Sequence, residues 1–242
     1  MSHGLVADYT DSEEEEQEIN EPPSKKLKLP NPLKNNSFDN EEVIDDPALH
    51  DFRVRSFPHV RGNWATYVFI QPTEIEFSDL QKCIHERLKF KKFDVKLIDK
   101  PHLSVSRVVT LQHIWINSFT KSLQDQFQIG LKPFRIRFEP NVKILVNEEK
   151  TRTFIGIEIL SNSFLKQLVK CCDQTLIEFN KEAFFDPPDF HISLAWCLGD
   201  QSIDTKELSQ ITQDWIDTLD QPYIEVNSVN CKIGNKLFEL KL

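Results

Sequence analysis

Two short segments of the sequence repeat one pattern: a histidine, an apolar residue, a serine and a second apolar residue. The first is His102-Leu103-Ser104-Val105, and the second, 89 residues later, is His191-Ile192-Ser193-Leu194. Side chains two residues apart on a β-strand face the same way, so each segment would present an imidazole and a hydroxyl on one side. The apolar residues would anchor the strand on its other side. We therefore predict that the two histidines and two serines line one site.

Two imidazoles suit the cleavage of a phosphodiester bond. Near neutral pH one ring can be neutral and accept a proton while the other is charged and donates one. Serine hydroxyls can donate hydrogen bonds to the non-bridging phosphate oxygens and hold the phosphorus between base and acid. We predict His102 and His191 as the catalytic pair and Ser104 and Ser193 as phosphate-binding residues. A single His-x-Ser pair is more often structural, so the prediction depends on the second copy.

Metal-dependent and nucleotide-loop chemistry are not predicted. The sequence has no HExxH-type spacing of histidines and carboxylates and no CxxC pair, and it lacks the GxxxxGK[ST] and GxGxxG loops. We therefore expect no metal and no other cofactor.

The net charge of −9 belongs to the beginning of the chain. Residues 1–50 hold thirteen acids and four lysines, whereas residues 51–242 hold 25 acids (38 − 13) and 25 bases (29 − 4). The rest of the chain is therefore neutral, and the acidic total does not exclude RNA as a partner. Residues 1–48 have too few large apolar side chains to fold, so we predict a disordered acidic tail before a domain at 49–242. Its basic cluster, Lys25, Lys26 and Lys28, is compatible with nuclear import or with a solvated charge run.

The remaining sequence alternates between β and helical periods. Ser78 with Gln81 predicts a capping box at the start of a helix. Thr110 predicts the cap of a second helix with an apolar stripe of Leu111, Trp115, Phe119, Leu123 and Phe127. The predicted strands lie at 64–70, 95–98, 101–109, 134–138, 143–146, 153–160, 190–198 and within 224–242, and the helices at 78–92, after 110, at 163–180 and from about 204.

Because a helix followed by a histidine-bearing strand occurs twice, we expect two similar halves. The predicted fold is α+β, with two pseudo-symmetric lobes, mainly antiparallel sheets flanked by helices, and an active-site cleft between the lobes. No apolar run approaches the roughly 20 residues that cross a bilayer, so no membrane contact is expected. Nothing marks a subunit interface, and we expect a monomer.

The paired motifs resemble those of the two-histidine phosphoesterase superfamily, in which tandem His-x-Ser/Thr motifs line a cleft between two lobes. Within it, Phe190-His191-Ile192-Ser193-Leu194-Ala195-Trp196-Cys197, together with the first motif and the acidic beginning of the chain, is similar to the U6 small nuclear RNA phosphodiesterases. The resemblance covers roughly residues 50–242. It implies a nuclear 3′-to-5′ exonuclease that trims the uridine or adenosine tail of U6 small nuclear RNA, as part of snRNA maturation for splicing. The product would end in a 2′,3′-cyclic phosphate, or in a 3′-phosphate as in some members.

The resemblance also implies roles for single residues. His191 would deprotonate the penultimate 2′-hydroxyl, and His102 would protonate the departing 5′-oxygen. The family has an aromatic residue, often tyrosine, six places before the second histidine, where it stacks on a base. Here that residue is Phe185, which keeps the ring but lacks the phenol; filling the core is its alternative role. Arg107 is a candidate for contact with the RNA backbone, as are Arg53, Arg55 and Arg61.

Two other functions remain open. A 2′,3′-cyclic nucleotide phosphodiesterase or RNA-ligase-like two-histidine enzyme would use the same four residues on a different end. The continuation Ser-Leu-Ala-Trp-Cys favours the U6 enzyme over this alternative. An inactive RNA-binding module is disfavoured because both histidines and both serines are present.

Overall fold

The structure, a computed structural model, describes residues 60–242. The predicted tail at 1–48, with its basic cluster, and also Arg53 and Arg55, lie outside the described residues. Within 60–242 no helix is long and apolar enough to cross a membrane. The helices of this part are α1 (Ser78–Phe90), α2 (Ile116–Gly130), α3 (Ser163–Glu178), α4 (Lys206–Asp217) and the short 3₁₀ helix η2 (His113–Trp115).

The strands of residues 60–242 form one antiparallel path. They are β1 (Asn63–Ile70), β2 (Lys96–Leu97), β3 (Leu103–Ser104), β4 (Val109–Gln112), β5 (Phe134–Val146), β6 (Arg152–Ile159), β7 (His191–Leu198), β8 (Tyr223–Val226), β9 (Ser228–Ile233) and β10 (Lys236–Lys241). Their order is β10-β9-β1-β3-β7-β6-β5-β8, with β2 paired to β7 and β4 to β1. The α+β class and the antiparallel pairing are as predicted.

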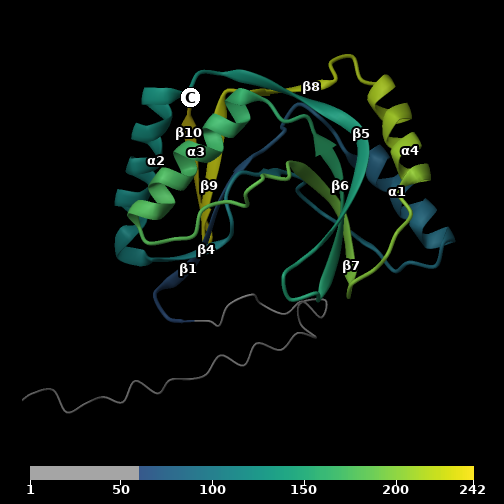
Figure 1. Cartoon of the computed structure of the whole chain (residues 1–242), viewed down its shortest axis with the longest axis horizontal. Coiled ribbons are helices and arrows are strands. Elements are labelled where there is room, and N and C mark those ends of the chain that lie inside the picture. The colour runs from purple at the N-terminus through teal and green to yellow at the C-terminus, as the bar shows by residue number, and fades with distance from the viewer. Residues whose placement is uncertain (1–59) are drawn as a thin grey trace, which may run out of the picture. The chain divides into compact units, whose positions relative to one another are not determined.

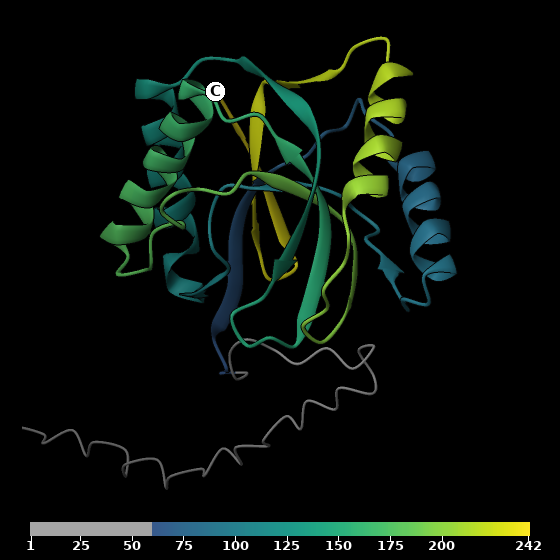
Figure 2. The same ribbon diagram turned by 45° about the vertical axis from the view of Figure 1, so that its right-hand side comes forward.

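The helices lie in two pairs on opposite sides of the strands. Figures 1 and 2 both show α2 beside α3 on one side and α1 beside α4 on the other. Each pair therefore joins a helix that precedes residue 131 to one that follows residue 160. The C-terminal hairpin β9–β10 likewise pairs with β1. One group of strands, β10-β9-β1-β3, meets the other, β7-β6-β5-β8, at the β3–β7 pair. Each half of the fold therefore contains elements from separate parts of the chain, and the halves are not consecutive in the sequence.

Helix α1 begins without the predicted capping box. Its N-cap is Phe77, and the Ser78 hydroxyl donates to the Glu76 carboxylate instead. The buried Gln81 amide points inward and donates to the carbonyls of Ile98 and Leu194, both at 2.8 Å. The box was wrong because this amide is the side-chain donor to the partly buried Ile98 carbonyl and a second donor to the buried Leu194 carbonyl, which also accepts from the Ile98 N–H. Leu80, Ile84 and Leu88 form the buried stripe of α1.

Thr110 does not cap a helix. Residues Val109–Gln112 form β4, which pairs with β1 from Thr66 to Asn63. Helix α2 therefore begins only at Ile116, and its buried stripe continues through Phe119, Leu123 and Phe127. Leu111 is buried from a strand, and Trp115 is largely exposed. The spacing of apolar residues at every fourth position led to a wrong helix start, because pairing with β1 overrides helical propensity in this segment.

Two predicted strands, at 134–138 and 143–146, are one bent strand. In β5 the register with β6 shifts between Phe138 and Val142, on either side of Pro140. Proline has no N–H to donate to the ladder, so the chain bulges there and then resumes pairing. The first part of β5 pairs with β8 and the second with β6. After the bend, β5 places Lys143 beside β6, where it takes part in the candidate site.

Candidate active site

The two motifs lie on neighbouring antiparallel strands. Leu103 of β3 is opposite Ile192 of β7, and both side chains are buried. The residues on either side of each therefore face the other way, toward one surface of the sheet. Continuing the register by one residue sets Ser104 beside His191 and His102 beside Ser193. The structure thus brings together all four predicted residues, on one face of the junction between the two groups of strands.

In this register each histidine lies beside the serine of the other motif. The two histidines are diagonal neighbours, and diagonal positions on adjacent strands lie about 7–8 Å apart. The imidazoles therefore flank a space into which both hydroxyls can also point. Neither Ser104 nor Ser193 forms a side-chain hydrogen bond with another residue of 60–242, whereas the buried Ser106 hydroxyl accepts from the Val68 N–H at 2.8 Å and donates to the Arg107 carbonyl.

Both imidazoles are oriented by the same backbone contact. Nδ1 of His102 lies 2.9 Å from the Lys100 carbonyl oxygen, and Nδ1 of His191 lies 2.8 Å from the Asp189 carbonyl oxygen. A carbonyl only accepts, so each Nδ1 carries the hydrogen, and in a neutral ring Nε2 keeps its lone pair. No residue of 60–242 hydrogen-bonds to either Nε2. Each ring can therefore accept a proton at Nε2 and, once charged, donate it there.

The surroundings favour sharing one proton between the two rings. Burial lowers the pKa of His102; the hydrogen bond to Lys100 partly offsets this, and the charge of Lys232 lowers the pKa further. Burial also lowers the pKa of His191, opposed by the hydrogen bond to Asp189 and its charge and reinforced by Lys143 and His102. Because a charged His102 disfavours a charged His191, one ring is available as acid while the other is available as base.

Aromatic rings on β1 pack against His102. The Phe69 ring contacts the imidazole edge-on at 4.9 Å between centroids, and the Tyr67 ring lies 5.8 Å away. Phe69 is opposite Ser104 in the register, so both rings share the face of the motif residues. Burial raises the pKa of Tyr67, which keeps its phenol neutral near pH 7. The sequence reasoning missed this pair, although the i, i+2 spacing on a predicted strand was the available signal.

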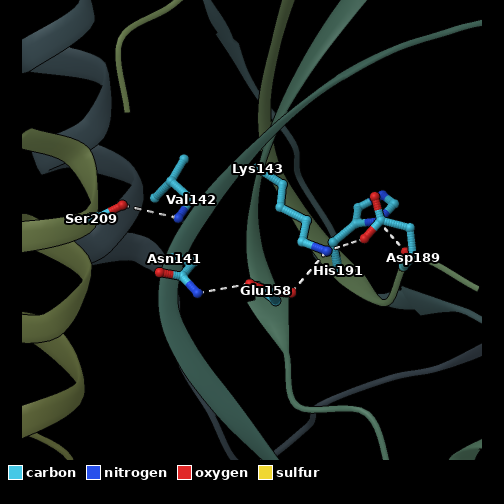
Figure 3. A network of polar contacts seen from close by, with 7 residues as sticks. All are labelled: Asn141, Val142, Lys143, Glu158, Asp189, His191 and Ser209. Carbon is cyan, nitrogen blue, oxygen red and sulfur yellow. Dashed lines mark hydrogen bonds and ion pairs between the residues drawn. The ribbon is translucent and has the colours of Figure 1, made fainter. Parts of the chain in front are cut away.

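An ion-pair network supports His191. In Figure 3 the Lys143 ammonium lies between the carboxylates of Glu158 and Asp189; it is 2.9 Å from Glu158 and forms an ion pair and hydrogen bond with Asp189. The Asn141 amide donates to the other oxygen of Glu158 at 2.9 Å. Burial lowers the pKa of Lys143, but its hydrogen bonds to Asp189 and Glu158 outweigh this and raise it overall. Lys143 therefore stays charged and holds Asp189, whose carbonyl orients His191.

Gly156 allows β6 to approach β7 closely. It lies opposite Ser193, and a Cβ at this position would be 3.0 Å from the Ile192 carbonyl oxygen and 3.4 Å from Cδ2 of His191. Any larger residue would press on the catalytic strand and on the imidazole itself. No sequence pattern singles out Gly156, Lys143, Glu158 or Lys232, because their importance depends on strand neighbours far apart in the chain.

Phe185 and Arg107 form a stacked pair. The Arg107 guanidinium lies 3.8 Å from the centroid of the Phe185 ring, and the ring is 46% exposed. Phe185 therefore does not fill the core, which was its alternative role. Arg107 also forms ion pairs with Glu148 at 2.9 Å and Glu182 at 3.5 Å. The position of Arg107 suits it to hold the Phe185 ring. Contact with RNA stays a prediction for Arg107, for Phe185 and for the exposed Arg61.

No group of three or more histidine, cysteine, aspartate and glutamate side chains within 60–242 is placed to hold a metal ion.

Comparison with known proteins identifies the family. A family model named HVSL and described as an uncharacterised conserved protein matches residues 27–241. U6 snRNA phosphodiesterase 1 of Xenopus laevis is 37% identical over 98% of this chain and 99% of its own length, and the Homo sapiens protein of that name is 39% identical over 82% and 77%. This chain belongs to the U6 snRNA phosphodiesterase 1 family. The family name describes an RNA phosphodiesterase, the enzyme class that the paired histidines predicted.

One solved structure has the same fold. The structure of Kluyveromyces marxianus Usb1 superposes with a TM-score of 0.50 at 7% identity, over 75% of this chain and 98% of that one. At this identity the likeness shows the fold alone. The Drosophila melanogaster member of the family, at 36% identity over 84% of this chain, extends the sequence relationship to insects.

Proposed function

We propose that this chain is a metal-independent 3′-to-5′ exoribonuclease that trims the 3′ oligouridine tail of U6 snRNA and leaves a 2′,3′-cyclic phosphate. The observation that carries the proposal is the matched state of the two rings, each with Nδ1–H held by a carbonyl and Nε2 available. The names of the relatives supply the RNA.

The chemistry balances as a transesterification. Nε2 of His191 accepts the proton of the penultimate 2′-hydroxyl, whose oxygen bonds to phosphorus. The bond from phosphorus to the 5′-oxygen of the last nucleotide breaks, and Nε2–H of His102 protonates that oxygen. Ser104 and Ser193 donate to the non-bridging oxygens as charge develops on them. Hydrolysis of the cyclic product to a 3′-phosphate is the alternative end.

The basic side chains near the site suit a phosphate ligand. Lys232 is exposed and lies opposite Tyr67 on β9, where its charge reaches His102. Phe185, with Arg107 behind one face of its ring, offers its exposed side for stacking on a base. The compartment that we infer is the nucleus, on the family resemblance and the basic cluster at Lys25, Lys26 and Lys28, and we expect the enzyme to act as a monomer.

The first experiment measures trimming of a 5′-labelled, oligouridine-tailed RNA in the presence of chelator. Wild-type protein should shorten the tail stepwise, and mass spectrometry should find a cyclic or 3′-phosphate end. His102→Ala and His191→Ala should each lose this activity, whereas His85→Ala, on α1, should keep it. A 2′-deoxy residue at the penultimate position should block cleavage because the attacking hydroxyl is missing.

Other outcomes separate the alternatives. Cleavage that stops in chelator and returns with a divalent ion would refute the metal-independent mechanism. Opening of a small 2′,3′-cyclic nucleotide with the tailed RNA left intact would favour the other two-histidine activity. RNA binding without any turnover would favour the inactive module.

A bridging 5′-sulfur substrate tests which histidine is the acid. A thiolate leaves without protonation, so the substrate should restore cleavage to His102→Ala but not to His191→Ala. The reverse pattern would exchange the two roles.

A further inference from the structure

A groove of about 1030 Å³ runs between α1 and α4 and shares no residue with the imidazole site. These two helices lie side by side at the right of Figures 1 and 2, away from the α2–α3 pair. The floor of the groove is apolar and includes Leu80, Ile211, Trp215 and Leu219. Phe90, at the end of α1, extends this surface and is 79% exposed.

The walls of the groove are helix faces. Helix α1 contributes Asp79, Cys83, Glu86 and Phe90, spaced three or four residues apart, and α4 contributes its own stripe at 207, 210, 211, 214, 215 and 218. Two neighbouring helices with an apolar floor between them form the kind of groove into which a third amphipathic helix packs.

The rim of the groove is strongly acidic. Six carboxylates line it against one base, Arg87. Arg87 is already paired with Glu207, which also pairs with Lys91. Within 60–242 no basic side chain forms an ion pair with Glu74, Glu76, Glu86 or Asp214. Because residues 60–242 hold 24 acids and 23 bases in total, this charge is a local concentration.

The charge and the shape of the groove together indicate which kind of ligand it can bind. Exposed carboxylates repel the phosphates of RNA, so the groove is unsuited to the proposed substrate. They attract lysine and arginine side chains, whose aliphatic stems can also cover apolar surface. A helix with leucine-like residues on one face and basic residues along its edges would match both the floor and the rim.

We propose that the α1–α4 groove is a docking site for a basic amphipathic helix of a partner protein. The partner's apolar face lies on Ile211, Leu219 and the exposed Phe90, and its basic residues reach Asp79, Glu86 and Asp214. Docking there leaves β3 and β7 uncovered, so the partner and the RNA can bind together.

The probe is a synthetic helix of about 14 residues, matched to the 13 residues of α1 and the 12 of α4. It carries leucines at i, i+3, i+4 and i+7 and lysines elsewhere. A second peptide of the same composition has its leucines scattered so that no apolar face forms. Binding to the full chain is measured by fluorescence anisotropy and located by backbone amide NMR shifts.

The expected result is saturable binding of the amphipathic peptide, with shifts concentrated in α1 and α4. Combined Asp79→Asn, Glu86→Gln and Asp214→Asn should weaken binding about tenfold, since each exposed ion pair contributes modestly. Phe90→Ala should weaken it a few-fold. A control with Asp125→Asn, Glu149→Gln and Glu239→Gln, exposed acids outside the groove, should bind like the wild type.

Three results would overturn the proposal. One is the absence of saturable binding by the full chain. Another is equal affinity for the scattered peptide, which would mean that net charge alone drives binding. The last is an oligouridine that shifts the groove amides in place of those around β3 and β7, which would reassign the groove to RNA.

Discussion

At the scale of single residues, each imidazole of the candidate site has its own lysine. Lys143 acts on His191 and Lys232 on His102, and both charges lower the pKa of the ring that they face. Lys143 has a second role, because it holds Asp189, whose carbonyl orients His191 (Figure 3). The two lysines therefore allow the charge effect and the positioning effect to be separated.

Lys143→Met should raise the pKa of His191 and lower kcat. The positive charge is lost, and the carboxylates of Asp189 and Glu158 are left unpaired beside the ring. With Asp189 released, we expect kcat to fall roughly ten- to hundredfold. NMR titration of the histidine Cε1–H signals and the pH profile of kcat measure the two effects.

Lys232→Met is the matched control. It removes a charge near His102 but no partner of Asp189, so it should raise the pKa of His102 while Asp189 keeps its ion pair and its contact with His191. A Lys143→Met variant in which the pKa of His191 rises but kcat stays at the wild-type value would argue against a positioning role.

Gly156→Ala should damage activity more than stability. The added methyl meets the Ile192 carbonyl and the His191 ring at 3.0 and 3.4 Å, so β7 must shift by a few tenths of an ångström. We expect about 1–3 kcal/mol of lost stability and a fall in kcat of about tenfold or more. Gly130→Ala, whose methyl would meet only side chains at 3.4 Å or beyond, should be close to wild type in both assays.

The four motif residues could be predicted from the sequence because both copies obey the twofold period of a strand. Their supporting residues could not. Lys143, Gly156 and Lys232 gain their roles from strand register, which pairs positions far apart in the chain. A single sequence contains no record of those pairs.

At the scale of elements, Gln81 connects α1 to the catalytic strand. Its buried amide donates to the carbonyls of Ile98 and Leu194, and Leu194 is on β7. Gln81→Met keeps the length of the side chain but removes the side-chain donor of the Ile98 carbonyl and one of the two donors of the Leu194 carbonyl, which keeps its bond from the Ile98 N–H. We expect a loss of about 1–3 kcal/mol in the free energy of unfolding, measured in urea.

Gln124→Met tests whether burial is the cause. Gln124, on α2, makes comparable contacts with both the N–H and the carbonyl of Lys241, but these hydrogen bonds are exposed to solvent. Its replacement should cost under about 0.5 kcal/mol, because water can replace the lost partners. Equal losses at the two positions would contradict the explanation by buried carbonyls.

Elements with a long, regular apolar period could be predicted, and their ends could not. The helices at 78–92 and 163–180 could be predicted because burial of one helix face needs only local spacing. The predicted capping box at Ser78 and the predicted cap at Thr110 were wrong because, in each case, a contact with a distant residue was favoured over the local one. Gln81 turned to two distant carbonyls, and Val109–Gln112 paired with β1.

At the scale of the whole folded part, the halves exchange elements. Helix α1 packs on α4 and α3 on α2, so the core and the site both depend on contacts across the sequence. Periodicity predicts that a helix has a buried face but not which helix will cover it. The α+β class could therefore be predicted, whereas the order β10-β9-β1-β3-β7-β6-β5-β8 could not.

Because both imidazoles sit at the junction β3–β7, their protonation should be coupled to global stability. Burial lowers both pKa values below the ordinary 6.5, so in the window just under 6.5 the unfolded chain binds more protons than the folded one. The stabilisation from the two neutral rings is complete above 6.5 and is lost as the pH falls through the folded pKa values. Asp173, whose carboxyl pKa is raised by burial, acts with the opposite sign and closer to its ordinary value of 3.8.

Urea unfolding between pH 7.5 and about 5 should therefore show a falling free energy of unfolding in the wild type. In the double variant His102→Gln, His191→Gln the fall should be shallower, because neither ring remains to take up a proton. His85→Gln with His113→Gln, two histidines outside the site, should keep the wild-type slope. If the site variant keeps the full slope and the control variant flattens it, the pH dependence arises elsewhere, and the two rings are not held neutral by the fold.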